Sequence, residues 1–189
     1  MLVLIAGLVV FFGVHSVRMV LPQWRDARHS AMGEKAYKGA YSLISFVGLA
    51  LIVWGWMLYR PEAVQVYVPP AWGRHVAMLF VLLAFVLVAA SSTPTGYIKA
   101  AVRHPMVLGV LLWSAGHLLA NGDMAGVILF GVFLAYTILN FFSVAGRDAE
   151  APVSKGARGD VLAIVAGVLG YAAFVFWLHE FLFGVSPLS

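Results

Sequence analysis

The chain has 189 residues, of which 62% are hydrophobic and only 11% are charged. A soluble domain carries about 25% charged residues, so this composition excludes an ordinary soluble protein and predicts an integral membrane protein. No cysteine is present, which excludes disulfide bonds and thiolate ligands to a metal. The formal charge of +4 is small and no nucleic-acid-binding motif occurs, so we expect no nucleic-acid partner.

Six segments are apolar enough to cross a bilayer as helices, which takes about 20 residues. They cover residues 2–21, 39–59, 74–90, 105–120, 124–144 and 161–183. Only Asn121-Gly122-Asp123 separates the fourth from the fifth, so we expect a tight helical hairpin there. Lipid tolerates no open sheet edge. We therefore predict an all-α, polytopic membrane protein, a bundle of about six transmembrane helices that forms one domain over residues 1–189, with no soluble domain.

The basic residues predict the orientation of these helices. Ten of the twelve Lys and Arg residues lie at the end of the first span or in the loops after the first, third and fifth spans, whereas Arg60 and Arg74 lie on the opposite side. Cytoplasmic loops carry the excess of Lys and Arg, so we expect both termini in the periplasm of a bacterial inner membrane. The first loop, 22–38, mixes charge signs and predicts a short interfacial helix. The fifth, 145–160, is rich in Gly, Ala, Pro and charge and predicts a flexible linker.

A histidine inside a lipid-exposed span is energetically unfavourable, and such residues are usually functional. His15 lies inside the first span and shares a helix face with Phe11, Phe12 and Arg18. This face suits a flat apolar cofactor whose carboxylate would meet Arg18. The alternative is that His15 packs against a neighbouring helix and donates a hydrogen bond to a main-chain carbonyl. Arg18 would then only reach the cytoplasmic headgroups.

The fourth span contains a second such histidine, His117. Trp113 and Asn121 lie four residues to either side of it, so all three share one helix face. His104 is thirteen residues before His117, a rotation of about 140° on an ideal helix, so the two cannot readily bind one metal ion. We expect His104 at the start of this helix, ahead of Pro105 in the first turn. Its role is either that of an interfacial residue or a catalytic one.

His15 and His117 are therefore the better pair of metal ligands. Imidazole suits iron, copper and zinc, but a hydrolytic zinc usually has three protein ligands. Two imidazoles without nearby carboxylates favour haem, whose own carboxylates would meet basic side chains. His15 lies nearer the cytoplasmic side than His117, and a shared iron requires similar depth.

The remaining histidines have simpler interpretations. We expect His29 to be solvated in the first loop, and His75 and His179 to lie at the outer interface without binding a metal. Asp123 is expected to cap the fifth span or to shape the turn before it.

Four blocks of the sequence resemble the NnrU family. They are GVHSVR in the first span, GEKAYKGAYS entering the second, RHPMVLGVLLWSAGHLLANGD, and YAAFVFWLH near the end. The bacterial members are associated with denitrification and nitric oxide metabolism. The plant relative, 15-cis-zeta-carotene isomerase, is a membrane protein that binds haem b. The resemblance implies that His15 and His117 are the iron ligands. Plant isomerases carry a cysteine near the second ligand, and this chain has none.

The block GYIKAAVRHPMVLG is also similar to membrane methyltransferases of the isoprenylcysteine type, where an Arg-His-Pro element helps to bind S-adenosylmethionine. The Glu-Glu and Tyr-x-x-Tyr elements that follow in those enzymes are missing from AGRDAEAPVSKGARGD here. A common architecture is more consistent with this pattern than a common reaction.

These observations predict a multi-pass inner-membrane protein that binds haem b. The resemblance implies cis-trans isomerisation of a polyene such as zeta-carotene, and lipid-soluble small molecules as partners besides the bilayer. One alternative is a non-catalytic haem protein linked to nitric oxide or denitrification. The other is a methyltransferase that uses S-adenosylmethionine. The predicted cofactor-site residues, beyond the two ligands, are Arg18, Arg103, His104, Trp113 and Asn121.

Overall fold

The computed structural model describes residues 1–147 and 151–188, and this part of the chain is helical with no strand. Five of its helices are long and apolar enough to cross a membrane: Leu2–Val20, Glu34–Glu62, Gly73–Ser92, Met124–Arg147 and Arg158–Phe183. Large apolar side chains stay exposed on them, among them Leu2, Phe142 and Phe181. Such surfaces are compatible with lipid. The predicted all-α membrane fold is confirmed.

The fourth predicted span, by contrast, is a short helix. This helix, α6, covers Pro105–Ala120 with 16 residues. At 1.5 Å per residue it is about 24 Å long, compared with about 30 Å for the hydrocarbon core of a bilayer. The expectation of about six spans therefore holds for five long helices and one short one among the described residues.

The chain falls into two compact units. The first comprises Met1–Val64 with Asp123–Leu129, and the second comprises Gln65–Gly122 with Phe130–Ser189. Helix α7 (Met124–Arg147) contributes to both. Each unit is described by itself below, and the single domain over the whole chain stays a prediction.

In the first unit, α1 (Leu2–Val20) packs along α3 (Glu34–Tyr59). Glycines make the contact close. A Cβ atom built on Gly48 would lie 2.8 Å from the Phe11 backbone nitrogen, and one on Gly7 would lie 2.6 Å from that of Ile52. Small residues let helices approach in the same way in membranes. At the closest points between α1 and α3, a glycine of one helix therefore lies directly against the backbone of the other.

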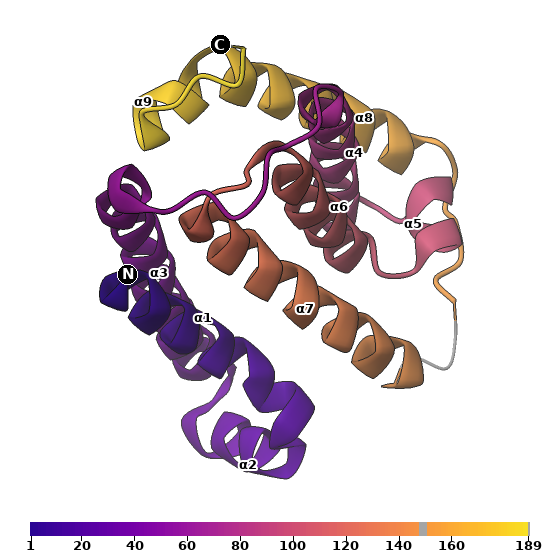
Figure 1. Ribbon diagram of the computed structural model, residues 1–189. Coiled ribbons are helices and arrows are strands. Elements are labelled where there is room, and N and C mark those ends of the chain that lie inside the picture. Colours follow the sequence, from indigo (N-terminus) through magenta and orange to yellow (C-terminus); the bar gives the residue numbers. More distant parts are fainter. Residues whose placement is uncertain (148–150, 189) are drawn as a thin grey trace. The chain divides into compact units, whose positions relative to one another are not determined.

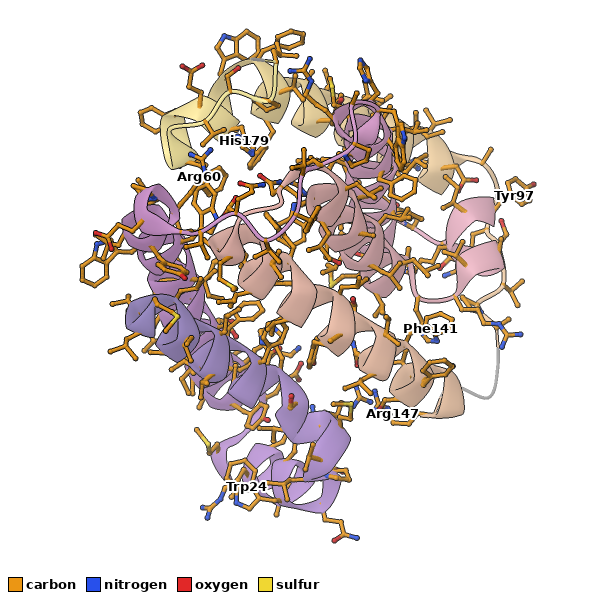
Figure 2. All side chains as sticks on the ribbon, in the orientation of Figure 1. Trp24, Arg60, Tyr97, Phe141, Arg147 and His179 are labelled. Carbon is orange, nitrogen blue, oxygen red and sulfur yellow. The ribbon has the colours of Figure 1, made fainter. Side chains whose placement is uncertain are left out.

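In the sequence between α1 and α3, residues Pro22–Met32 form the short helix α2, which confirms the helix predicted in the first loop. Its Trp24 side chain is half exposed (Figure 2). The next helix, α3, begins at Glu34, five residues before the predicted span. Lys38 donates a hydrogen bond to Glu34 at 2.5 Å, one turn earlier, and this pair supports a charged first turn that hydropathy alone does not include. A 3₁₀ turn, η1 (Arg60–Glu62), ends the helix.

In the second unit, α4 (Gly73–Ser92) packs against both α6 and α8 (Arg158–Ala173), as Figure 1 shows. Glycines again permit close contact. A Cβ on Gly167 would lie 2.6 Å from Val86 Cα, and one on Gly116 would lie 3.2 Å from Ala77 Cα. Because Gly116 directly precedes His117, this contact fixes the rotation of α6 about its axis. The side of α6 that carries Gly116 faces α4.

Composition predicts a flexible linker for the fifth loop, but its described end, residues 151–160, makes specific contacts, and residues 148–150 lie outside the described residues. The Lys155 backbone nitrogen donates to Thr95 O at 2.8 Å, and the Asp160 carboxylate accepts hydrogen bonds from the backbone nitrogens of Tyr97 and Ile98, at 2.8 and 2.9 Å. Asp160 thereby satisfies donors in the first turn of α5 (Tyr97–Val102). The described end of this loop is thus docked against the loop after α4, a long-range contact that local composition does not encode.

At the other end of the second unit, the segment that precedes α4 forms hydrogen bonds with the end of α6. The backbone nitrogens of Val66 and Tyr67 donate to Gly122 O at 2.8 and 3.1 Å. The Tyr67 hydroxyl also donates to Leu118 O, and to Asn121 O at 2.9 Å. Sequence patterns gave no reason to single out Tyr67. Its hydroxyl satisfies carbonyls at the end of α6 that have no partner within the helix.

Candidate functional site

His117 lies in the last turn of α6 and is anchored by its own helix. Its Nδ1 is 2.8 Å from Trp113 O, one turn earlier, and the Asn121 side chain donates to His117 O at 2.8 Å. The predicted grouping of Trp113, His117 and Asn121 on one face is confirmed by these contacts. Asn121 therefore acts on the main chain of His117 and ends the helix, while Trp113 O sets the orientation of the imidazole.

An aromatic wall from α7 stands beside His117. The His117 ring stacks on Phe130, with centroids 4.5 Å apart and planes 26° apart. Trp113 makes edge contacts with Phe130 and Phe133, both at 5.1 Å. These ring contacts join α6 to the part of α7 that begins at Phe130 and belongs to the same unit. The wall gives the imidazole an apolar surrounding.

His179 is the neighbour that the sequence did not predict. Its ring centroid lies 6.5 Å from that of His117, with the two planes 15° apart. Its Nδ1 is 2.6 Å from Val185 O, and its ring makes an edge contact with Phe183 at 5.1 Å. The side chain extends from the start of α9 (His179–Phe183), as Figure 2 shows. A residue expected at the interface thus lies next to a proposed ligand.

His15 has a comparable anchor in the first unit. Its Nδ1 is 2.6 Å from Phe11 O, its ring stacks on Phe11 at 4.1 Å, and Tyr41 of α3 contributes a tilted ring at 5.2 Å. The alternative interpretation of His15 expects this hydrogen bond to a main-chain carbonyl and this contact with a neighbouring helix. The same hydrogen bond is also compatible with a histidine that binds a metal. His15 and His117 belong to different units, so their pairing stays a prediction.

The basic candidates occupy helix ends. Arg18 is exposed in the last turn of α1. His104 is the N-cap residue of α6, with Pro105 directly after it, as expected. Asp123 accepts a hydrogen bond from the Gly126 backbone nitrogen at 2.9 Å, which confirms its capping role. Lys99 donates to Ser91 O at 2.9 Å.

Arg103 lies at the centre of a strained turn. Its φ is 60° and its ψ −50°, and the His104 backbone nitrogen donates across it to Val102 O at 2.6 Å. This is a γ-turn with positive φ, a rare conformation for a residue with a side chain. Strain of this kind often occurs at functional sites. The Arg-His-Pro element therefore has a backbone feature that its sequence alone did not predict.

The donor chemistry of the two histidines fits a haem iron. Metal-bound histidines usually donate their second ring nitrogen to a carbonyl or carboxylate, and Nδ1 of both His15 and His117 faces a main-chain carbonyl. Within the described ranges, no cluster of three or more His, Asp or Glu side chains is arranged to hold a metal ion. A porphyrin supplies four further ligands of its own, so two imidazoles suffice for it.

Comparison with known protein families matches residues 3–187, nearly the whole chain, to the family described as NnrU protein. No curated protein and no solved structure shows significant similarity to the chain.

Proposed function

The chain belongs to the NnrU family, and on that premise we propose that it is a haem b-binding membrane protein in which His117 and His15 would hold the iron. The observation that carries the proposal is the shared anchor of both imidazoles. With the proton on Nδ1 and donated to Trp113 O or Phe11 O, Nε2 holds the lone pair that binds iron. Each anchor also restrains the rotation of its ring before any cofactor binds.

Arg18 and Arg103 are the proposed partners of the haem propionates. An unpaired carboxylate in a poorly hydrated site is strongly disfavoured. Arg18 lies in the last turn of α1, which carries His15, and Arg103 directly precedes His104, the N-cap of α6, which carries His117. Lys99 is less suitable as a propionate partner because its ammonium group already donates a hydrogen bond to Ser91 O. His104 occupies the N-cap position of α6 and stays a member of the proposed site.

The proposed reaction is cis-trans isomerisation of a lipid-soluble polyene, as in the plant relative. When bound, haem would supply an iron centre able to interact with a conjugated double bond. The residues of this chain would hold the iron through imidazole and offer the apolar side chains of Trp113, Phe130 and Phe133 to a flat hydrocarbon. The same wall would exclude water from the site.

We also propose that the protein lies in a bacterial inner membrane with both termini in the periplasm. In the second unit, the contact between Lys155 and Thr95 brings two basic loops to one end of the helices. That end carries Lys99, Arg103, Lys155 and Arg158, whereas the opposite end carries Arg74. This asymmetry supports a cytoplasmic location for the basic end.

The visible absorption spectrum of the purified protein tests the haem proposal. We expect the wild-type protein to bind haem b and to show a low-spin spectrum that changes on reduction. His117→Ala removes an axial ligand and should shift the Soret band or lose most of the haem. Trp113→Phe and Asn121→Ala should change the spectrum less, because they alter only the surroundings of the ligand.

His29→Ala is the matched control, because His29 lies on α2, outside the proposed site. It should keep the wild-type spectrum. A wild-type spectrum in the His117→Ala protein would contradict the proposal. Binding of S-adenosylmethionine by a haem-free wild-type protein would instead favour the methyltransferase alternative.

A further inference from the structure

His117 and His179 form a pair of imidazoles within one compact unit. In both rings Nδ1 faces a main-chain carbonyl, at 2.8 Å from Trp113 O and 2.6 Å from Val185 O. Among the described residues, neither Nε2 atom has a hydrogen-bond partner. Both rings therefore have the same nitrogen available as a ligand. An arrangement in which both second nitrogens are anchored is typical of metal-binding histidines.

The distance between the two ring centroids is close to the distance between two imidazoles that bind one ion. An imidazole nitrogen binds a metal at about 2.0–2.1 Å and lies about 1.1 Å from its ring centroid, so two opposite imidazoles have centroids about 6.4 Å apart. The observed separation is 6.5 Å, with nearly parallel planes. The pair is also free of the depth difference that separates His15 from His117 in the sequence.

The helix that carries His179 departs from α-helical geometry directly before this residue. Residues Phe174–Leu178 form a π-helical turn, η2, between α8 and α9. Such a turn takes up one extra residue, and π-turns inside helices are frequent at functional sites. It rotates His179 by about 100° relative to its place in a regular helix. The wide turn therefore determines which face of the helix carries this imidazole.

We propose that His179 is a third imidazole of the site, able to bind the same iron as His117. This inference rests on the proposed haem-binding function and deepens it. The bound group would again be a haem, since the described residues offer no third His, Asp or Glu ligand of the kind a bare zinc ion needs. His179 would then either replace His15 or act as the resident second ligand.

The test compares the spectra of the purified full-length chain with haem b in detergent. We expect His15→Ala to retain a six-coordinate, low-spin spectrum, because His117 and His179 still hold the iron. The double variant His15→Ala/His179→Ala should become five-coordinate and high-spin, and added imidazole should restore the low-spin spectrum. His15→Ala/His179→Gln repeats the test with a side chain that keeps most of the volume and does not bind iron.

The matched control is His15→Ala/His75→Ala, which removes an exposed histidine at the start of α4 and should match His15→Ala alone. The proposal is overturned if the His179 double variants keep the spectrum of His15→Ala. It is also overturned if His15→Ala alone loses the low-spin spectrum and regains it with added imidazole. Absence of haem from the wild-type protein would instead reject the proposed function, and so the two failures are distinguishable.

Discussion

At the scale of single residues, Arg103 combines a strained backbone with the charge that we propose as a propionate partner. A γ-turn with positive φ is unfavourable for any residue except glycine, and strain of this kind costs about 1–3 kcal/mol. The sequence-adjacent His104 and Pro105 depend on this turn, because it ends α5 and starts α6. Charge and strain can be separated by substitution.

We predict that Arg103→Gly and Arg103→Ala both lower haem content, since both remove the proposed propionate partner. Only Arg103→Gly should also raise the midpoint of thermal unfolding in detergent, because glycine adopts the turn without strain. The measurements are the ratio of Soret to protein absorbance and the helical circular dichroism signal on heating. Lys99→Ala is the control and should keep its haem. Equal haem content in all three variants would leave Arg103 as a topological anchor only.

Tyr67 is the residue that fixes the end of the His117 helix. Its hydroxyl donates to carbonyls of Leu118 and Asn121, directly after His117. A typical intramolecular hydrogen bond contributes about 0.5–1.5 kcal/mol. We predict that Tyr67→Phe lowers the free energy of unfolding by this order and broadens the Soret band, since α6 can fray toward His117. Tyr97→Phe is the control, because that hydroxyl lies on α5, at the other end of the unit. Equal unfolding midpoints for both variants would contradict the assigned role.

At the scale of helices, glycine contacts determine how closely α1 and α3 pack. Gly48 lies against the backbone of Phe11, the residue whose carbonyl anchors His15. On the same helix, a Cβ at Gly39 would meet nothing within 4 Å. The two positions therefore form a matched pair that separates helix packing from helix propensity.

We predict that Gly48→Ala destabilises the protein by about 1–3 kcal/mol, as overpacking does, because the new Cβ would lie 2.8 Å from Phe11 N. It should also shift the haem spectrum by moving the His15 anchor. Gly39→Ala should be neutral or stabilising, since alanine favours helix over glycine by about 1 kcal/mol. The measurement is thermal unfolding in detergent, with the Soret band recorded in parallel. Equal midpoints in both variants would show that the helices tolerate a wider separation here.

At the scale of the whole molecule, hydropathy was enough to predict the helical membrane fold. Periodicity also placed Trp113, His117 and Asn121 on one face, because the first two lie one turn apart in α6 and Asn121 caps the end of the same helix. It did not predict His179, since its proximity to His117 depends on a π-turn and on packing between distant segments. The docking of Asp160 on α5 was missed for the same reason. Contacts across more than 60 residues leave no local signal in a sequence.

Orientation in the membrane is the last prediction, and the absence of cysteine makes it easy to test. Every introduced cysteine is the sole thiol of its variant. Ser30→Cys lies on exposed α2, in the basic first loop, and should react with a membrane-impermeant maleimide only after the cells are broken. Val68→Cys, in a segment where the side chain is 85% exposed, should react in intact spheroplasts. A phosphatase fused after Ser189 should be active. The first, third and fifth loops are basic and are expected in the cytoplasm, which places the C-terminus in the periplasm. If Ser30→Cys is labelled in intact spheroplasts and the fusion is inactive, the protein has the opposite orientation. His117 and His179 would then lie in the cytoplasmic half of the membrane and not in the periplasmic half.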